Sequence, residues 1–104
     1  MNFNFPKNGY HPDDLIRRCG YGEIFDRKTD QVSYKRALGG GGYPRFHVYL
    51  KDFDTYFEVS LHLDQKKASY VGSSAHSGEY DGEQVDNEAR RITAEIAKVL
   101  GIEI

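Results

Sequence analysis

The amino-acid sequence predicts an α+β fold: a four-stranded antiparallel β-meander with a short N-terminal helix and a long C-terminal helix packed on one face. In residues 43–67, apolar and polar side chains alternate with a period of two, which is typical of a sheet with one covered face. In residues 83–100, apolar side chains recur at helical spacing. A chain of 104 residues has room for one modest core, so we expect a single domain over residues 1–104.

The first predicted elements are a helix and two strands. Pro12 suits the first helical position, Asp13 and Asp14 suit the positive end of the helix dipole, and Gly20 is a natural stop. Residues 21–26 and 31–37 then alternate as strands around a turn. Four consecutive glycines at 39–42 predict a flexible loop, and no following helix or Walker lysine supports a nucleotide-binding P-loop.

The next two strands form a hairpin in residues 43–64. A tip at residues 52–55 pairs Lys51 with Tyr56, which places His47 diagonally across from His62. A register shifted by two residues preserves the same two faces, so the pattern allows that pairing as well. The apolar face comprises Phe46, Val48, Leu50, Phe57, Val59, Leu61 and Leu63.

The C-terminal helix follows a polar loop at residues 65–82. Asp81 is the predicted N-cap, with Gln84 completing a capping box, and Gly101 ends the helix. Its apolar stripe is the expected cover for the apolar face of the hairpin, and comprises Val85, Ala89, Ile92, Ile96 and Val99 or Leu100.

The face left uncovered carries side chains that bind anions or metals, and the following loop adds more. The candidate ligand-binding residues are Arg45, His47, Tyr49, His62, Asp64, Lys66 and His76. We expect the loops that contain the four glycines and His76 to roof this face in part. The sequence shows no Ser-centred nucleophile motif, and Cys19 is expected to be a small buried apolar residue.

The leading hypothesis is a binding module for a phosphate-bearing ligand, with nucleic acid as the favoured class. The net charge of −2 argues against a strongly basic protein, but residues 17–51 carry eight basic and three acidic side chains. Under this hypothesis His47, His62 and Arg45 contact the anion. Further phosphate contacts would come from Lys35, Arg36, Lys66 and Lys67, and stacking surfaces from Tyr34, Tyr43, Tyr49 and Tyr56.

An alternative is a metal-dependent phosphodiesterase or hydrolase. Its zinc or manganese ligands would be His47, His62, and His76 or Asp64, with Glu79 as general base. The spacing matches no recognised metal-binding signature.

Two further readings use the same face. It can be the site of protein interaction, including a homodimer that charging Tyr49 would disrupt, or an ordinary solvated surface.

The remaining expectations concern location and relatives. The N-terminal stretch lacks a signal peptide, no segment is apolar enough to span a bilayer, and a single cysteine forms no internal disulfide, so we expect a cytoplasmic protein. The stretches "YPRFHVYL", "LHLDQKK" and "HSGEYDGE" resemble a group of small uncharacterised bacterial proteins, over roughly the last two thirds of the chain. The resemblance implies a bacterial, intracellular origin and assigns no role to any residue.

Overall fold

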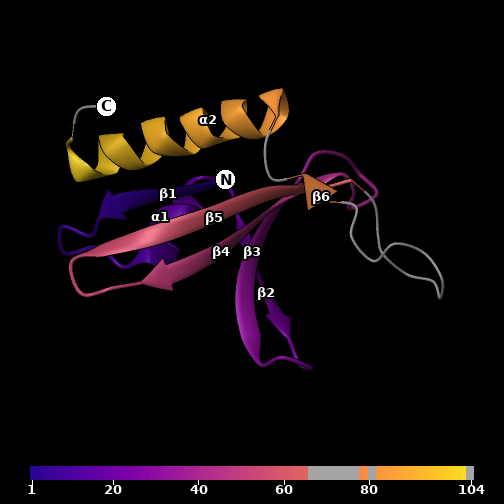
Figure 1. Ribbon diagram of the computed structural model, residues 1–104, viewed down its shortest axis with the longest axis horizontal. Helices are drawn as coiled ribbons and strands as arrows, with labels where there is room; N and C mark the ends of the chain where they lie inside the picture. The colour runs from indigo at the N-terminus through magenta and orange to yellow at the C-terminus, as the bar shows by residue number, and fades with distance from the viewer. Residues whose placement is uncertain (66–77, 80–81, 103–104) are drawn as a thin grey trace.

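The computed structural model describes residues 1–65, 78–79 and 82–102. In these residues an antiparallel sheet has the strand order β1-β5-β4-β3-β2, a short strand β6 pairs with β5, and two helices complete the fold (Figure 1). The elements are β1 (Asn2–Pro6), α1 (Pro12–Arg18), β2 (Gly22–Asp26), β3 (Gln31–Ala37), β4 (Arg45–Asp52), β5 (Tyr56–Asp64), β6 (Gly78–Glu79) and α2 (Glu83–Leu100).

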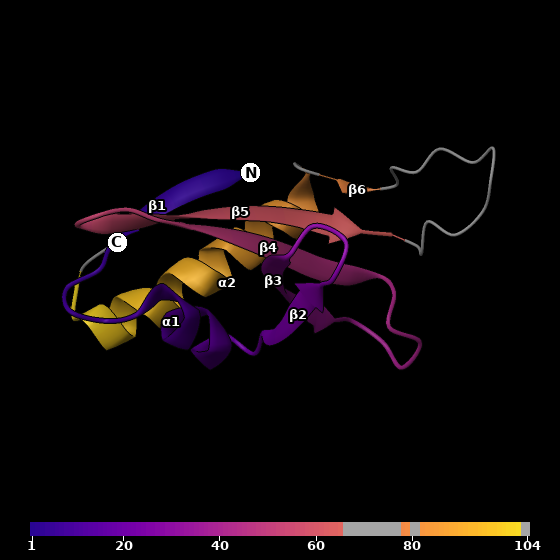
Figure 2. The same cartoon turned by 90° about the horizontal axis from the view of Figure 1, so that it is seen from below.

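The predicted α+β class and the meander from β2 to β5 are confirmed. Each of these four strands pairs antiparallel with the next. The helix α2 crosses one face of the sheet and packs on β5, while α1 packs on β4 and beside α2 (Figure 2). The hairpin formed by β2 and β3 bends away from β4 and β5, as Figure 1 shows.

The prediction of four strands was wrong, because β1 adds a fifth strand along the edge of β5. Phe5 lies opposite Phe57 and Phe3 opposite Val59, so both phenylalanines face the core while the alternating asparagines face the other way. The alternation of Asn and Phe in residues 2–5 is a period-two signal for this strand. Only pairing with a strand some fifty residues later stabilises it, and that contact is non-local.

The register of the hairpin differs by two residues from the pairing of Lys51 with Tyr56. His47 lies opposite His62, Arg45 opposite Asp64, and Lys51 opposite Glu58. The turn is tighter than expected, since the N–H of Phe53 donates to the carbonyl of Tyr56 at 2.9 Å. Because the shift is an even number of residues, every side chain keeps its predicted face.

The core lies between the apolar face of the sheet and the two helices. All four inward residues of β5 are fully buried, each contributing roughly 1.5–3 kcal/mol. From the helices, the largest fully buried side chains are Leu15, Ile16, Val85, Ile92 and Ile96, and Cys19 is buried as predicted. Among the described residues, neither helix is long and apolar enough to cross a membrane.

The ends of α2 follow the prediction only at the C-terminus. Gly101 ends the helix in the left-handed conformation, with φ of 70°, where glycine has no steric penalty. The N-cap is Gly82, with no side-chain cap hydrogen bond, so the predicted capping box headed by Asp81 was wrong. Asp81 itself lies outside the described residues.

Candidate functional site

The sheet face opposite the helices, which we term the polar face, carries the predicted site residues of β4 and β5. Strand alternation places Arg45, His47 and Tyr49 on this face from β4, and His62 and Asp64 from β5. The register sets the two histidines directly opposite one another, and not diagonally as expected. All five residues are therefore neighbours on one surface.

Asp64 is the centre of a polar cluster on this face. Its Oδ2 lies 3.1 Å from His47 Nδ1, and its Oδ1 lies 3.2 Å from His62 Nε2. Arg45 Nε donates to the same Oδ2 at 3.3 Å. His47 Nε2 lies 2.8 Å from the hydroxyl of Ser33 on the neighbouring strand β3. We term these five residues the Asp64 cluster.

The ionisation state of Asp64 decides which groups of the cluster donate hydrogen bonds and which accept them. Burial alone would raise the pKa of Asp64, but the contacts with His47 and His62 outweigh burial and hold that pKa well below its usual range. An ionised carboxylate only accepts hydrogen bonds, so His47 Nδ1 carries the hydrogen that faces it. In the tautomer with a hydrogen on Nδ1 alone, Nε2 accepts a hydrogen bond from the Ser33 hydroxyl.

Both imidazoles are more enclosed than the expectation of an open face implied. His47 is 8% exposed and His62 is 7% exposed, although neither points into the apolar core. Their ring centroids lie 4.9 Å apart, and Tyr49 stacks on His62 at 5.7 Å. Tyr49 is itself 41% exposed, so it forms the outer layer of this stack.

A pocket of about 410 Å³ adjoins the Asp64 cluster, between the turn that joins β2 to β3 and the face of β4. Of the predicted site residues, Arg45, His47 and Tyr49 line it, whereas His62 and Asp64 are not among the described residues that do. None of the four glycines at 39–42 lines it either, so that part of the expected roof does not border this pocket, and the loop with His76 lies outside the described residues. Several of its residues were not predicted from the sequence: Phe25, Arg27, Lys28 and Ser33.

Several predicted phosphate and stacking contacts fall elsewhere. Tyr34 is 6% exposed and lies opposite Val48, so it belongs to the core. Arg36 lies opposite Phe46 and pairs with Glu88 of α2, on the helix side of the sheet. These two assignments were wrong because both residues occupy alternate positions of β3, which point away from the polar face.

Other predicted contacts lie beside Arg45, at the hairpin turn or outside the described residues. The guanidinium of Arg45 lies over the ring of Tyr43, 4.5 Å from its centroid, while Tyr56 stacks on Phe53 at the hairpin turn. The predicted contacts Lys66, Lys67 and His76 lie outside the described residues.

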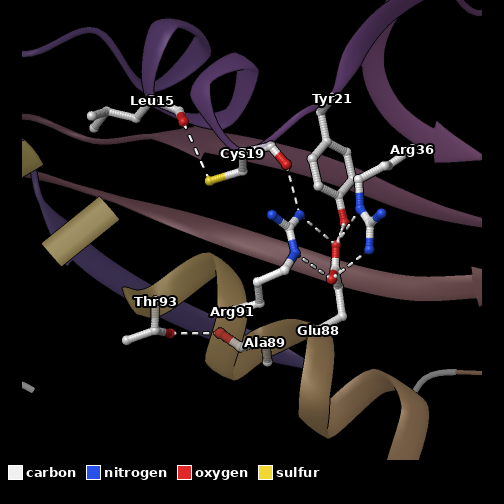
Figure 3. Close-up of polar contacts among 8 residues, drawn as sticks. All are labelled: Leu15, Cys19, Tyr21, Arg36, Glu88, Ala89, Arg91 and Thr93. Carbon is white, nitrogen blue, oxygen red and sulfur yellow. Dashed lines mark hydrogen bonds and ion pairs between the residues drawn. The ribbon is translucent and has the colours of Figure 1, made fainter. Parts of the chain in front are cut away.

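A second polar cluster, which was not predicted from the sequence, surrounds Glu88 (Figure 3). The hydroxyl of Tyr21 donates to this carboxylate at 2.6 Å, and Arg36 and Arg91 each donate two hydrogen bonds at 2.8–3.0 Å. Arg91 also donates to the carbonyl of Cys19, at the end of α1, at 2.6 Å. The contacts join α1, β3 and α2.

The electrostatics of the Glu88 cluster favour a structural role. Burial alone would raise the pKa of Glu88, but hydrogen bonds from Arg91, Arg36 and Tyr21 outweigh burial and lower it to about 2. Burial and the contact with Glu88 raise the pKa of Tyr21 well above its usual range. Glu88 lies between Val85 and Ile92 on the apolar stripe of α2, and an acid at that spacing is the signal that could have located it.

No protein-family model, curated protein or solved structure matches this chain. The possible functions of the polar face are therefore inferred from the geometry of its own side chains. The Asp64 cluster combines metal-ligand side chains with an ionised carboxylate, and the adjoining pocket combines basic with aromatic side chains.

Proposed function

We propose that this protein binds a phosphate-bearing ligand, with single-stranded nucleic acid as the favoured class, in the pocket beside the Asp64 cluster. The observation that carries the proposal is the charge of the pocket wall. The wall contains three basic side chains, Arg27, Lys28 and Arg45. Among the described residues that line the pocket, Asp26 is the acidic side chain. The Asp26 carboxylate accepts a hydrogen bond from the backbone N–H of Lys28 at 2.9 Å, within the turn. A phosphate group is the ligand chemistry that this basic wall favours.

Aromatic side chains beside the basic wall favour a ligand with bases. Phe25 is 51% exposed and Tyr49 is 41% exposed, and both line the pocket. A base stacked on such a ring gains roughly 1–3 kcal/mol, largely independent of its identity. A volume of about 410 Å³ is within the range of small-molecule pockets. The pocket would thus hold one segment of a longer strand.

Fluorescence anisotropy with a labelled oligothymidylate tests the proposal. The double variant Arg27→Gln/Lys28→Gln should bind at least about tenfold more weakly, because each lost phosphate contact removes a charge-assisted hydrogen bond. Lys98→Gln is the matched control, since Lys98 is an exposed lysine on α2. Wild-type affinity in the double variant would contradict the proposal. Competition by inorganic phosphate and by a mononucleotide distinguishes a phosphate site from one that needs the strand.

A second candidate function is metal-dependent cleavage of a phosphodiester held in the same pocket. The observation that favours it is that His47 both lines the pocket and belongs to a group with metal-ligand atoms. Release of p-nitrophenol from bis(p-nitrophenyl) phosphate in the presence of zinc or manganese would support it. The activity should disappear with a chelator and in Asp64→Asn. Turnover that persists in either condition would exclude this mechanism.

A further inference from the structure

The ligand atoms of His47, His62 and Asp64 lie close enough together to share one cation. Within the described part of the chain, these three residues each offer one ligand atom, and the atoms all lie within 4.8 Å of one another. A tetrahedral ion with bonds of about 2.0–2.1 Å holds its ligands roughly 3.4 Å apart. The distances from His47 Nδ1 to Asp64 Oδ2, 3.1 Å, and from His62 Nε2 to the other carboxylate oxygen, Oδ1, 3.2 Å, are already near this value.

We infer that the Asp64 cluster is a binding site for a divalent transition metal, with zinc preferred over manganese. The ligand atoms are His47 Nδ1, His62 Nε2 and a carboxylate oxygen of Asp64. Two imidazoles and one carboxylate suit zinc, whereas manganese prefers a larger share of oxygen ligands. Three protein ligands leave a fourth position for water or substrate, as in catalytic zinc sites.

A neighbouring side chain orients His47 as metal sites require. A ligating histidine usually holds its other ring nitrogen in a hydrogen bond, which fixes the tautomer and the ring. For His47 that partner is the Ser33 hydroxyl, which lies 2.8 Å from Nε2. With a metal on Nδ1, the hydrogen moves to Nε2 and Nε2 donates to Ser33. Arg45 Nε also donates to the carboxylate of Asp64 at 3.3 Å, but its positive charge opposes a cation there, so this contact does not support the metal site.

The same contacts also describe a serine nucleophile, with Ser33, His47 and Asp64 in a row. That reading gives no part to His62, whose Nε2 lies as close to the carboxylate as His47 Nδ1 does. The metal site uses both imidazoles, and the structure therefore favours it.

The metal site does not depend on the proposed binding of a phosphate ligand, and a variant of Arg45 distinguishes the two proposals. The guanidinium next to Asp64 would attract a phosphate and repel a cation. Arg45→Gln should therefore weaken oligonucleotide binding but leave zinc affinity unchanged or raise it, by up to about 30-fold for one positive charge removed roughly 4 Å from a divalent ion in water. Loss of zinc binding in this variant would contradict the assigned roles. Failure of oligonucleotide binding alone leaves the zinc result unaffected.

Calorimetric titration of the metal-free protein with zinc chloride, then with manganese chloride, tests the site directly. We expect one equivalent of zinc, its loss in His62→Gln and Asp64→Asn, and a decrease of about 10- to 100-fold in Ser33→Ala. His11→Gln is the matched control, because His11 is an exposed N-cap residue of α1 outside the cluster. No stoichiometric zinc in the wild-type protein, or zinc retained by both ligand variants, would overturn the inference.

Two measurements on the wild-type protein keep the inference testable if a ligand variant fails to fold. X-ray absorption of the zinc-loaded protein should show nitrogen and oxygen neighbours, including two imidazoles, and no sulfur. A sulfur neighbour or fewer than two imidazoles would overturn the site. Labelling by a fluorophosphonate, with fluoride displaced and the serine oxygen bonded to phosphorus, should not occur. Labelling that disappears in Ser33→Ala would assign the cluster to serine chemistry instead.

Discussion

His47 lies directly opposite His62 across β4 and β5, with the two ring centroids 4.9 Å apart. The same register sets Arg45 opposite Asp64, so a single pairing of two strands assembles four of the five residues of the Asp64 cluster. The fifth, Ser33, comes from the next strand and reaches His47. The contributions of this cluster and of the Glu88 cluster to the free energy of unfolding can be measured separately.

Asp64→Asn should destabilise the metal-free protein by about 1–3 kcal/mol, because both enclosed imidazoles lose an ionised acceptor. Urea denaturation in the presence of a chelator measures the change. Asp54→Asn, an exposed position in the hairpin turn, is the control and should change stability by less than about 0.5 kcal/mol. Equal stability of the two variants would show that the Asp64 cluster does not stabilise the fold.

Glu88→Gln should lower the free energy of unfolding at pH 7 by about 3 kcal/mol. The substitution replaces the Glu88 carboxylate, whose side chain is only 3% exposed, with a neutral amide. The guanidinium groups of Arg36 and Arg91 then lose the negative charge with which they pair. Denaturant unfolding measures the loss, and Glu95→Gln on the same helix is the matched control. A change below about 1 kcal/mol would mean that the Glu88 cluster contributes little.

The stability of the wild-type protein should fall in acid because of Glu88. Its pKa in the folded protein is about 2, below the ordinary value of 4.5, so its stabilising contribution is complete above pH 4.5. The contribution is lost as pH falls from 4.5 toward 2, and amounts to roughly 3 kcal/mol over that range. Unfolding measured between pH 7 and pH 2.5 should show wild type converging on Glu88→Gln. Parallel pH profiles for the two proteins would contradict this assignment.

Oligonucleotide affinity should depend on salt through three basic side chains. If Arg27, Lys28 and Arg45 each neutralise one phosphate, log K against log salt has a slope of about −2 for a single strand. The double variant Arg27→Gln/Lys28→Gln should reduce the slope to about −0.7. Anisotropy titrations at several salt concentrations give both values. A wild-type affinity that does not change with salt would rule out phosphate contacts.

Cys19 should resist alkylation in the folded protein. Burial raises the pKa of its thiol to about 11, so little thiolate forms at pH 8. Iodoacetamide should label the protein within minutes in denaturant and far more slowly in buffer, as followed by intact mass. Rapid labelling of the folded protein would show that the end of α1 opens readily.

The sequence predicted part of the site through strand alternation. A register shift by an even number of residues leaves every side chain on its face, so the grouping of Arg45, His47, Tyr49, His62 and Asp64 could be predicted. Tyr34 and Arg36 were misassigned because they were chosen by residue type, whereas alternation places them on the helix side. The basic residues of the β2–β3 turn were missed, because only the bend of that hairpin brings them beside His47.

The sequence alone determined the secondary structure of the meander, the two helices and the apolar face that they share. These features follow from local spacing, because a period of two or of 3.6 residues decides which side chains can be buried together. Only the tertiary structure decided the pairing of β1 with β5, the two-residue choice of register and the buried charge of Glu88. Each of these depends on contacts between residues far apart in the chain, where several arrangements satisfy the same local pattern and packing selects one.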